Sequence, residues 1–292
     1  MNNTSINLFG KLPKGLIALY RDVISVSDRL NIKVLIVGAM ARDLVLVHGY
    51  GARLERGTRD VDFGISVATW EEFEALKAEL IKIGFSESPP TQHRLARHDS
   101  EGLPWDIDII PFGDIANEKN EISWPPNADV VMSVAGFDEA LLHAISVKIS
   151  DSPDTFISVA SPAGIVILKL IAWLERDPHK KPKDAEDIVY IISSYSKIPE
   201  VFDALYEDGH MEAQDWNETL ASASKLAADC AKIASRQTAL FLADNLLTRP
   251  ELLEQLSQQM PDYAHSPPQE QLSVFAESFL AIVAERWRTN RG

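Results

Sequence analysis

The feature that most limits the fold is a change of pattern near Ser161. Before this point, short apolar runs typical of strands alternate with helical segments, as in the run at residues 32–37 that ends at Gly38. After it, the apolar segments carry helical spacing with little strand signal. The pattern predicts an α+β protein with strands and helices in residues 1–158 and an all-helical domain in residues 159–292.

Length and charge narrow the classes of protein that this chain can belong to. At 292 residues it is long enough for two domains. The 28 Lys and Arg against 43 Asp and Glu give a formal charge of −15, which argues against broad, non-specific nucleic-acid binding and leaves a local basic patch open. The single cysteine, Cys230, indicates a reducing compartment. No signal peptide or membrane span is evident, so we expect a cytoplasmic protein with no membrane partner.

Asp60 and Asp62 lie two apart in a predicted strand. Strand side chains alternate between faces, so both carboxylates point to the same face and lie a few ångströms apart. Two like charges at that distance repel, and a divalent metal ion between them is the commonest way to offset the repulsion. The alternative is a solvated strand edge, where Asp blocks pairing with another strand.

A second pair of acids lies in a predicted hairpin. Residues 92–99 and 103–112 flank the loop Ser-Glu-Gly, which indicates two antiparallel strands. Its second arm carries Asp106 and Asp108 on one face, so either could act with the first pair. Periodicity leaves residues 137–162 open between strands and short helices.

These blocks together resemble a known superfamily. The chain has G-A at Gly38 and Ala39, D-V-D at 60–62 and D-I-I-P at 108–111. This order resembles the nucleotidyltransferases, which place a glycine turn after the first strand, D-x-D on the second and a third carboxylate on a later strand. With the blocks SPAGIVILKLIAW and KPKDAEDIVYII, residues 30–195 most resemble the AbiEii-like predicted nucleotidyltransferases, which include toxins of type IV toxin–antitoxin pairs. The resemblance implies a polymerase-beta-like mixed sheet with flanking helices, and a helical domain that completes the nucleotide cleft.

The resemblance also implies a reaction. A nucleoside monophosphate would pass from a nucleoside triphosphate to a hydroxyl, and divalent metal ions would neutralise the charge that gathers on the phosphoryl oxygens. Two Mg²⁺ ions are expected, bridged by Asp60 and Asp62, with Asp108 completing the second site and acting as a base. The resemblance favours Asp108 over Asp106 for this third position.

Three further positions are candidates for nucleotide binding. Gly38 allows the backbone near the triphosphate, but Ala39 lacks the hydroxyl that many members carry there, so backbone amides would have to hold the phosphate. Arg42 could reach a phosphate or pair with a nearby acid. Lys169 interrupts an apolar helix, where the resemblance implies contact with the triphosphate and the alternative is a solvent-facing lysine.

The last candidates lie in the block K-D-x-x-D. Asp184 and Asp187 share a helix face, and the resemblance implies a functional acid here without deciding between them. Asp184 also fits a plain role as a helix N-terminal charge. Lys183 precedes them in the basic stretch 176–183, which could steer a triphosphate or an RNA end, or form a solvated loop.

The acceptor stays open at this level. If the toxin resemblance holds, a tRNA 3′ end is the leading acceptor and an antitoxin protein is a partner. The acidity of the chain favours a small molecule as the second candidate acceptor. A protein hydroxyl is the third. A catalytically silent module that binds a nucleotide or a partner is the alternative from another class, and Ala39 is the residue that favours it.

Overall fold

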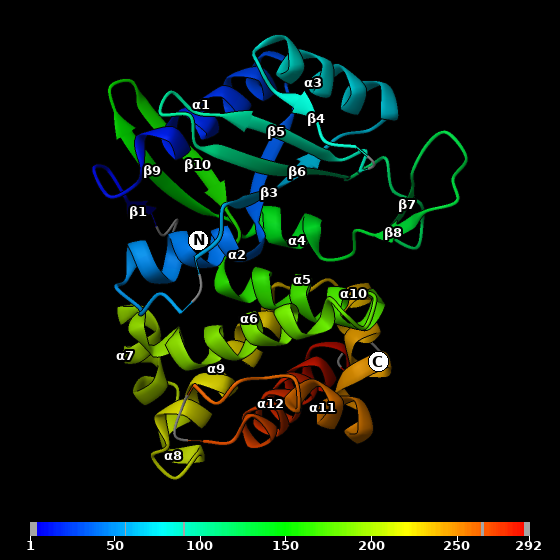
Figure 1. Cartoon of the computed structure of the whole chain (residues 1–292). Coiled ribbons are helices and arrows are strands. Elements are labelled where there is room, and N and C mark those ends of the chain that lie inside the picture. Colours follow the sequence, from blue (N-terminus) through cyan, green and yellow to red (C-terminus); the bar gives the residue numbers. More distant parts are fainter. Residues whose placement is uncertain (1–4, 56, 90, 264–265, 289–292) are drawn as a thin grey trace. The chain divides into compact units, whose positions relative to one another are not determined.

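The structure is a computed structural model in which residues 5–55, 57–89, 91–263 and 266–288 are described (Figure 1). It divides into two compact units. The sheet unit comprises residues 1–49 and 53–161, and the helical unit comprises residues 50–52 and 162–292. The roles that the sequence assigns to the two parts stay predictions.

The sheet unit contains a mixed sheet with helices on its faces, as expected for the α+β class. The described strands of this sheet follow the order β1-β9-β10-β2-β3-β6-β5-β4, and β7 and β8 form a separate ribbon. The elements of this unit are β1 (Ser5–Asn7), α1 (Lys14–Arg29), β2 (Lys33–Val37), α2 (Gly38–Arg42), the π-helical segment η1 (Asp43–Gly49), β3 (Asp60–Ser66), α3 (Trp70–Lys82), β4 (Ser86–Glu87), β5 (Arg94–His98), β6 (Pro104–Phe112), β7 (Glu121–Ser123), β8 (Val131–Ser133), α4 (Phe137–Leu142), β9 (Ile145–Asp151) and β10 (Asp154–Val159).

The pairing directions make this sheet mixed. Strand β3 runs antiparallel to β2 and parallel to β6, and β6 runs antiparallel to β5. The predicted hairpin is therefore confirmed as β5 and β6. The segment that periodicity left open contains one short helix, α4, and the antiparallel pair β9 and β10.

The central strands are covered on both faces. On β3 the ring of Phe63 lies 6.0 Å from that of Tyr20 in α1. A Cβ added to the next residue, Gly64, would lie 3.0 Å from side-chain atoms of Phe112 and Phe137, so α4 packs closely on the opposite face. Because strand residues alternate, Asp60 and Asp62 lie on the face that α4 covers.

A threonine side chain caps the start of helix α3. The hydroxyl of Thr69 accepts a hydrogen bond from the backbone N–H of Glu72 at 3.3 Å, and Glu71 and Glu72 place negative charge in the first turn. The chain reverses at Gly84, whose φ of 103° suits glycine.

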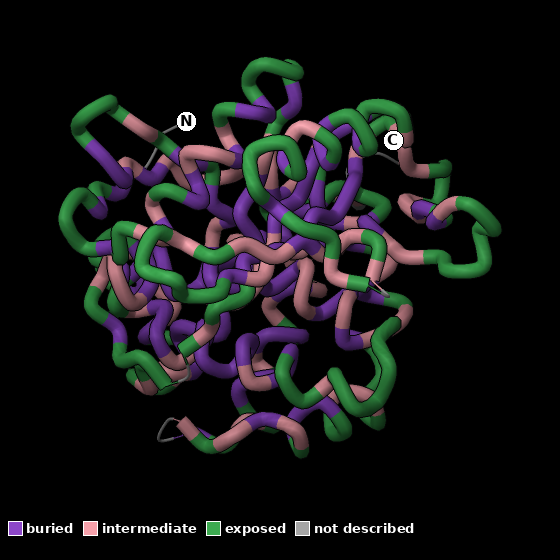
Figure 2. The backbone as a smooth tube through the Cα atoms, turned by 45° about the horizontal axis from the view of Figure 1, so that its top comes forward, coloured by how far each residue is buried: buried purple, intermediate pink, exposed green. Residues whose placement is uncertain are grey.

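The described part of the helical unit contains helices and no strand. Its elements are α5 (Pro162–Glu175), α6 (Lys181–Ser194), the 3₁₀ turn η2 (Tyr195–Lys197), α7 (Pro199–Glu207), α8 (His210–Ala213), α9 (Glu218–Ile233), α10 (Arg236–Leu242), the π-helical segment η3 (Ala243–Leu247), α11 (Pro250–Ser257) and α12 (Pro268–Arg288). Buried and exposed residues alternate along many segments, as the changes of colour in Figure 2 show. Cys230 is a buried residue, and burial raises the pKa of its thiol. Within the described ranges, no helix combines the length and apolar character needed to cross a membrane.

Candidate active site

A row of chemically distinctive residues crosses four neighbouring strands of the sheet. Val37 pairs with Asp62, Asp62 with Asp108 and Asp108 with Arg94. Register partners on adjacent strands lie about 5 Å apart and point to the same face. We call Gly38, which directly follows Val37, together with Asp62, Asp108 and Arg94 the sheet row.

Gly38 lies directly against Asp62. Its φ is +71°, and a Cβ at this position would lie 2.0 Å from the Oδ2 atom of Asp62. Both the backbone conformation and the close approach of the carboxylate therefore require glycine here. Helix α2 begins at this residue, so the turn and the first aspartate pair form one local arrangement. Ala39 follows as the second residue of that helix, half-buried and without a hydroxyl.

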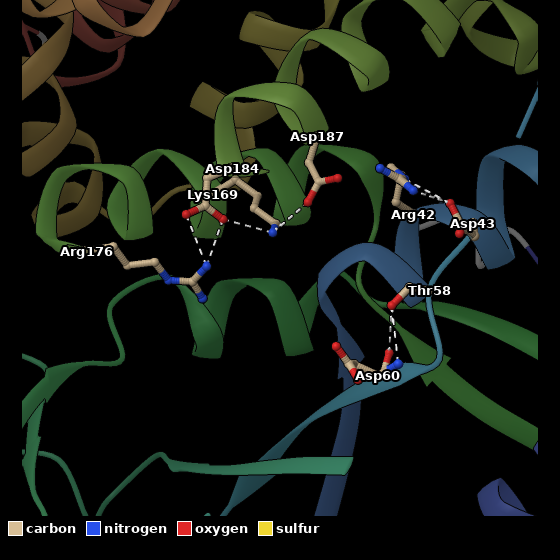
Figure 3. Close-up of polar contacts among 8 residues, drawn as sticks. All are labelled: Arg42, Asp43, Thr58, Asp60, Lys169, Arg176, Asp184 and Asp187. Atoms are coloured by element: carbon tan, nitrogen blue, oxygen red, sulfur yellow. Dashed lines mark hydrogen bonds and ion pairs between the residues drawn. The ribbon is translucent and has the colours of Figure 1, made fainter. Parts of the chain in front are cut away.

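Asp60 and Asp106 form the next register pair, two residues along the same strands. Asp60 is exposed, and its backbone N–H donates to the hydroxyl of Thr58 at 3.3 Å (Figure 3). Asp106 is half-buried. Of the two acids on β6, Asp108 is the one aligned with Asp62; its role as the third carboxylate stays a prediction.

Asp108 is bound by a residue that the sequence reasoning did not single out. The guanidinium of Arg94 donates two hydrogen bonds to it, from Nε to Oδ1 at 2.8 Å and from a terminal nitrogen to Oδ2 at 2.6 Å. The hydrogen bonds and charge of Asp108, with the charges of Asp60 and Asp106, outweigh partial burial and raise the pKa of Arg94. A signal for this contact exists in the hairpin. If Ser-Glu-Gly forms the loop, Asp99 lies opposite Leu103. Moving five residues away from the loop along each arm then places Arg94 opposite Asp108.

The acids of the row have the right chemistry for a magnesium ion but not the predicted arrangement. Carboxylate oxygens are the ligands that Mg²⁺ prefers. However, within the part of the chain that the structure describes, no group of three or more His, Cys, Asp or Glu is placed to hold a metal ion. Both oxygens of Asp108 contact Arg94 instead. Asp60 and Asp62 carry the kind of oxygen that Mg²⁺ prefers, and the two-ion arrangement with Asp108 as a ligand stays a prediction.

The helical unit contains a group of charges around two buried aspartates, which we call the helical charge cluster: Lys169, Arg176, Asp184 and Asp187 (Figure 3). The Lys169 ammonium lies 2.9 Å from Oδ1 of Asp184 and 2.7 Å from Oδ2 of Asp187. Arg176 contacts both oxygens of Asp184, at 3.0 and 3.1 Å. The two carboxylates are 0% and 1% exposed, and Lys169 is 12% exposed. Two cations and two anions therefore balance each other within the cluster.

The two aspartates favour the charged form of Lys169. Burial alone would lower the pKa of Lys169, but the charges of Asp187 and Asp184 and the hydrogen bond to Asp187 raise it above its usual value. Lys169 thus faces two acids and not solvent, and both Asp184 and Asp187 bind it. Their catalytic roles stay predictions. Arg176, taken from sequence as part of a basic loop, binds Asp184, whereas Lys183 is exposed.

Arg42 is only 2% exposed and binds its neighbour Asp43. Nε and a terminal nitrogen of Arg42 lie 2.9 and 2.7 Å from Oδ1 of Asp43 (Figure 3). This is the ion pair that the sequence left open as the alternative to a phosphate contact. We therefore do not include Arg42 in the candidate site.

Comparison with known families gives a match over most of the chain. Residues 26–288 match the family model described as nucleotidyl transferase AbiEii toxin, type IV TA system. No curated protein matches the chain.

Solved structures that resemble the chain are distant. They include a putative nucleotidyltransferase from H. pylori, with 11% identity, 96% of this chain and 100% of that chain covered, and a TM-score of 0.37. The antibiotic-resistance factor ANT(2'')-Ia has 15% identity, coverages of 70% and 97%, and a TM-score of 0.36. A Thermotoga maritima CCA-adding enzyme complexed with tRNA has 13% identity, coverages of 95% and 84%, and a TM-score of 0.27. The family match, and not these likenesses, carries the assignment.

Proposed function

The chain belongs to the family of AbiEii nucleotidyl transferase toxins of type IV toxin–antitoxin systems, and we propose that it transfers a nucleoside monophosphate from a magnesium-bound nucleoside triphosphate to a hydroxyl at the sheet row. It is a nucleotidyltransferase by family. In this reaction the acceptor oxygen forms a bond to the α-phosphorus, the bond from that phosphorus to the bridging oxygen of the β-phosphate breaks, and pyrophosphate leaves. The proton of the acceptor hydroxyl passes to solvent.

The observation that carries the proposal is the alignment of Asp62 with Gly38 on one side and Asp108 on the other. The glycine turn lets the Asp62 carboxylate lie directly against the backbone, in space that the Cβ of any other residue would fill. Asp60 and Asp62 would hold the magnesium ion, which offsets charge on the phosphoryl oxygens when bound. Arg94 keeps Asp108 in a fixed orientation next to them.

For the acceptor we propose a tRNA 3′ end, with an antitoxin protein as the regulator. Membership of a toxin family supports this choice. The formal charge of −15 favours a small-molecule hydroxyl as the second candidate, because an acidic surface repels RNA. A protein hydroxyl is a third possible acceptor, and two Mg²⁺ ions and a cytoplasmic location remain sequence predictions.

The test is a transfer assay with each of the four α-labelled nucleoside triphosphates, Mg²⁺ and total cellular RNA. We expect label from one triphosphate to appear on tRNA and to disappear in Asp62→Asn. Arg97→Gln is the matched control, because Arg97 lies on β5 next to the sheet row but binds Asp22. Label on small molecules alone would select the second acceptor. Nucleotide that binds without turnover would identify the silent module and overturn the proposal.

A further inference from the structure

Three aromatic rings form a continuous row on the surface of the helical unit. Phe202 and Tyr206 lie one turn apart on α7, and their ring centroids are 5.3 Å apart. Trp216 follows α8, which packs beside α7 (Figure 1), and its ring lies 6.3 Å from that of Tyr206. In chain order the three residues are 39%, 49% and 66% exposed. We call them the aromatic strip; contiguous exposed apolar surface of this kind marks interaction sites, whereas single exposed residues do not.

The backbone at Trp216 is unusual for a bulky residue. Asp215 and Trp216 have φ values of 49° and 63°, in the left-handed region that glycine adopts without cost. Backbone hydrogen bonds fix this turn, because the N–H of Trp216 donates to the carbonyl of Met211 at 2.8 Å and that of Asn217 to the carbonyl of Gln214 at 2.9 Å. Neither the backbone conformation nor burial therefore favours tryptophan here. Strain at an exposed side chain of this kind points to a function of the ring at the surface.

The segment that carries the aromatic strip is acidic. Residues 198–224 contain no Lys or Arg, and all of their Asp and Glu residues are exposed: Glu200, Asp203, Glu207, Asp208, Glu212, Asp215 and Glu218. On α7 the acids at positions 200, 203 and 207 follow helical spacing and form a stripe beside the two aromatic residues. Val201 and Leu205 are the buried residues of this helix. Aromatic rings and carboxylates thus share the outer surface of α7.

Aromatic faces and carboxylates together attract a cationic ligand. The face of a Trp or Tyr ring binds a guanidinium or an ammonium, and carboxylates beside it add attraction and hydrogen-bond acceptors. A guanidinium also stacks flat on an aromatic ring, which favours Arg over Lys. RNA bases can stack on the same rings, but the phosphates of an RNA strand would lie beside exposed carboxylates of like charge. The chemistry of the surface therefore favours a basic polypeptide over RNA.

We propose that the aromatic strip and the acids beside it on α7 form a docking surface for an arginine-rich segment of a partner protein. Arginine side chains of that segment stack on the rings and pair with the carboxylates. Tyr and Trp are the residue types that most often contribute strongly to binding at protein interfaces, which suits them to anchor the segment. The surface belongs to the helical unit, so the proposal goes beyond the reaction at the sheet row and does not depend on it.

The experiment measures how the full-length chain binds a short fluorescein-labelled peptide of alternating Arg and Gly, by fluorescence anisotropy without nucleotide. We expect Trp216→Ala to weaken this binding by about 10-fold. Phe156→Ala is the matched control and should bind as the wild type does, because Phe156 is also 50% exposed but lies on β10 in the sheet unit. A peptide of alternating Lys and Gly of the same length should bind the wild type more weakly than the Arg peptide.

A pair of charge variants separates this surface from the overall charge of the chain. The double variant Asp203→Asn and Glu207→Gln removes two charges beside the aromatic strip. Its control, Glu74→Gln and Glu101→Gln, removes two exposed charges from the sheet unit. We expect the first to weaken binding of the Arg peptide by about 10-fold and the second by less than about threefold, because salt screens distant charges. Thermal unfolding checks that each variant is folded.

Four results would overturn the proposal. The first is a wild type that does not bind the Arg peptide, and the second is binding that Trp216→Ala leaves unchanged or that both charge variants weaken equally. The third is a labelled oligouridylate that binds more tightly than the Arg peptide and is lost in Trp216→Ala, which would identify an RNA surface. The fourth is a wild-type dimer in sedimentation equilibrium that Trp216→Ala converts to a monomer, which would make the strip a contact between copies. If Trp216→Ala does not fold, Trp216→Gly replaces it, because glycine suits the left-handed backbone.

Discussion

The sheet row and the helical charge cluster both bring aspartates and cationic side chains together, but the aspartates differ in how deeply they are buried. In the cluster, Lys169 and Arg176 balance two buried aspartates through short contacts. On β3 and β6, two register pairs place four carboxylates on one face, Arg94 binds Asp108, and Asp60 is exposed. The comparison teaches that exposed charge, as at Asp60, is what a cationic ligand can reach, whereas balanced and buried charge contributes first to the fold.

The largest effect should come from removing one charge of the row. Asp62→Asn keeps the size of the side chain beside Gly38 but removes its charge, so we expect nucleotide transfer to fall by about 10³-fold. The half-exposed position predicts little change in thermal unfolding. Initial transfer rates and melting curves on the same preparation test both statements. Transfer at the wild-type rate would mean that the sheet row takes no part in the reaction.

The cluster should respond in the opposite way. Lys169→Met leaves two buried carboxylates short of a partner, and we expect a loss of about 3–5 kcal/mol in the free energy of unfolding by denaturant titration. Lys148→Met is the matched control, because Lys148 also contacts two aspartates, Asp151 and Asp154, which are 42% and 65% exposed. That variant should lose less than about 1 kcal/mol.

The same variant also tests the catalytic role that the resemblance implies for Lys169. Transfer is measured under conditions where Lys169→Met is still folded. A rate that falls only with the folded fraction would limit Lys169 to the fold. A larger fall would add the cluster to the catalytic residues and break the contrast between the two regions.

Gly38→Ala should affect the row at its other end. The positive φ costs a non-glycine residue about 1–2 kcal/mol, and the added Cβ would collide with the Asp62 carboxylate. Displacing that carboxylate should reduce transfer on the order of 10²-fold. Gly10→Ala, which has a similar φ of +75° and nothing within 4 Å of its Cβ, is the control for backbone strain alone. Equal transfer rates in Gly38→Ala and Gly10→Ala would mean that the contact between Gly38 and Asp62 does not matter for the reaction.

The smallest effect is expected for Arg176→Gln. Because this side chain is 42% exposed and Asp184 retains Lys169 as a partner, the free energy of unfolding should fall by about 1 kcal/mol. A loss as large as that of Lys169→Met would mean that the balance of the cluster depends equally on both cations. Denaturant titration of the two variants side by side decides this.

Much of the sheet row followed from the sequence because its signals are local. The alternation in D-V-D placed Asp60 and Asp62 on one face, and the hairpin signals placed Asp108 on a strand with Asp106. The parallel pairing of β3 with β6, which aligns Asp62 with Asp108, depends on packing between distant segments. The hairpin register also predicts the neighbour of Asp108, because the loop Ser-Glu-Gly places Arg94 opposite it.

The helical charge cluster was less predictable. Spacing placed Asp184 and Asp187 on one face of α6, and Lys169 stood out within an apolar helix. Helical periodicity does not say which face of α5 packs on α6, so the contacts of Lys169 with both acids, and of Arg176 with Asp184, could not be derived. Arg42 illustrates the same limit. Its ion pair with Asp43 forms inside the protein, and the sequence does not show that both side chains are buried.

The most direct test of the account is a metal exchange at Asp62. In Asp62→Cys the hard carboxylate is replaced by a soft thiolate, which binds Mg²⁺ poorly and Cd²⁺ well. If the Asp62 carboxylate holds the ion of the reaction, this variant should lose transfer with Mg²⁺ and regain part of it with Cd²⁺. Undiminished transfer with Mg²⁺ in Asp62→Cys would contradict the account.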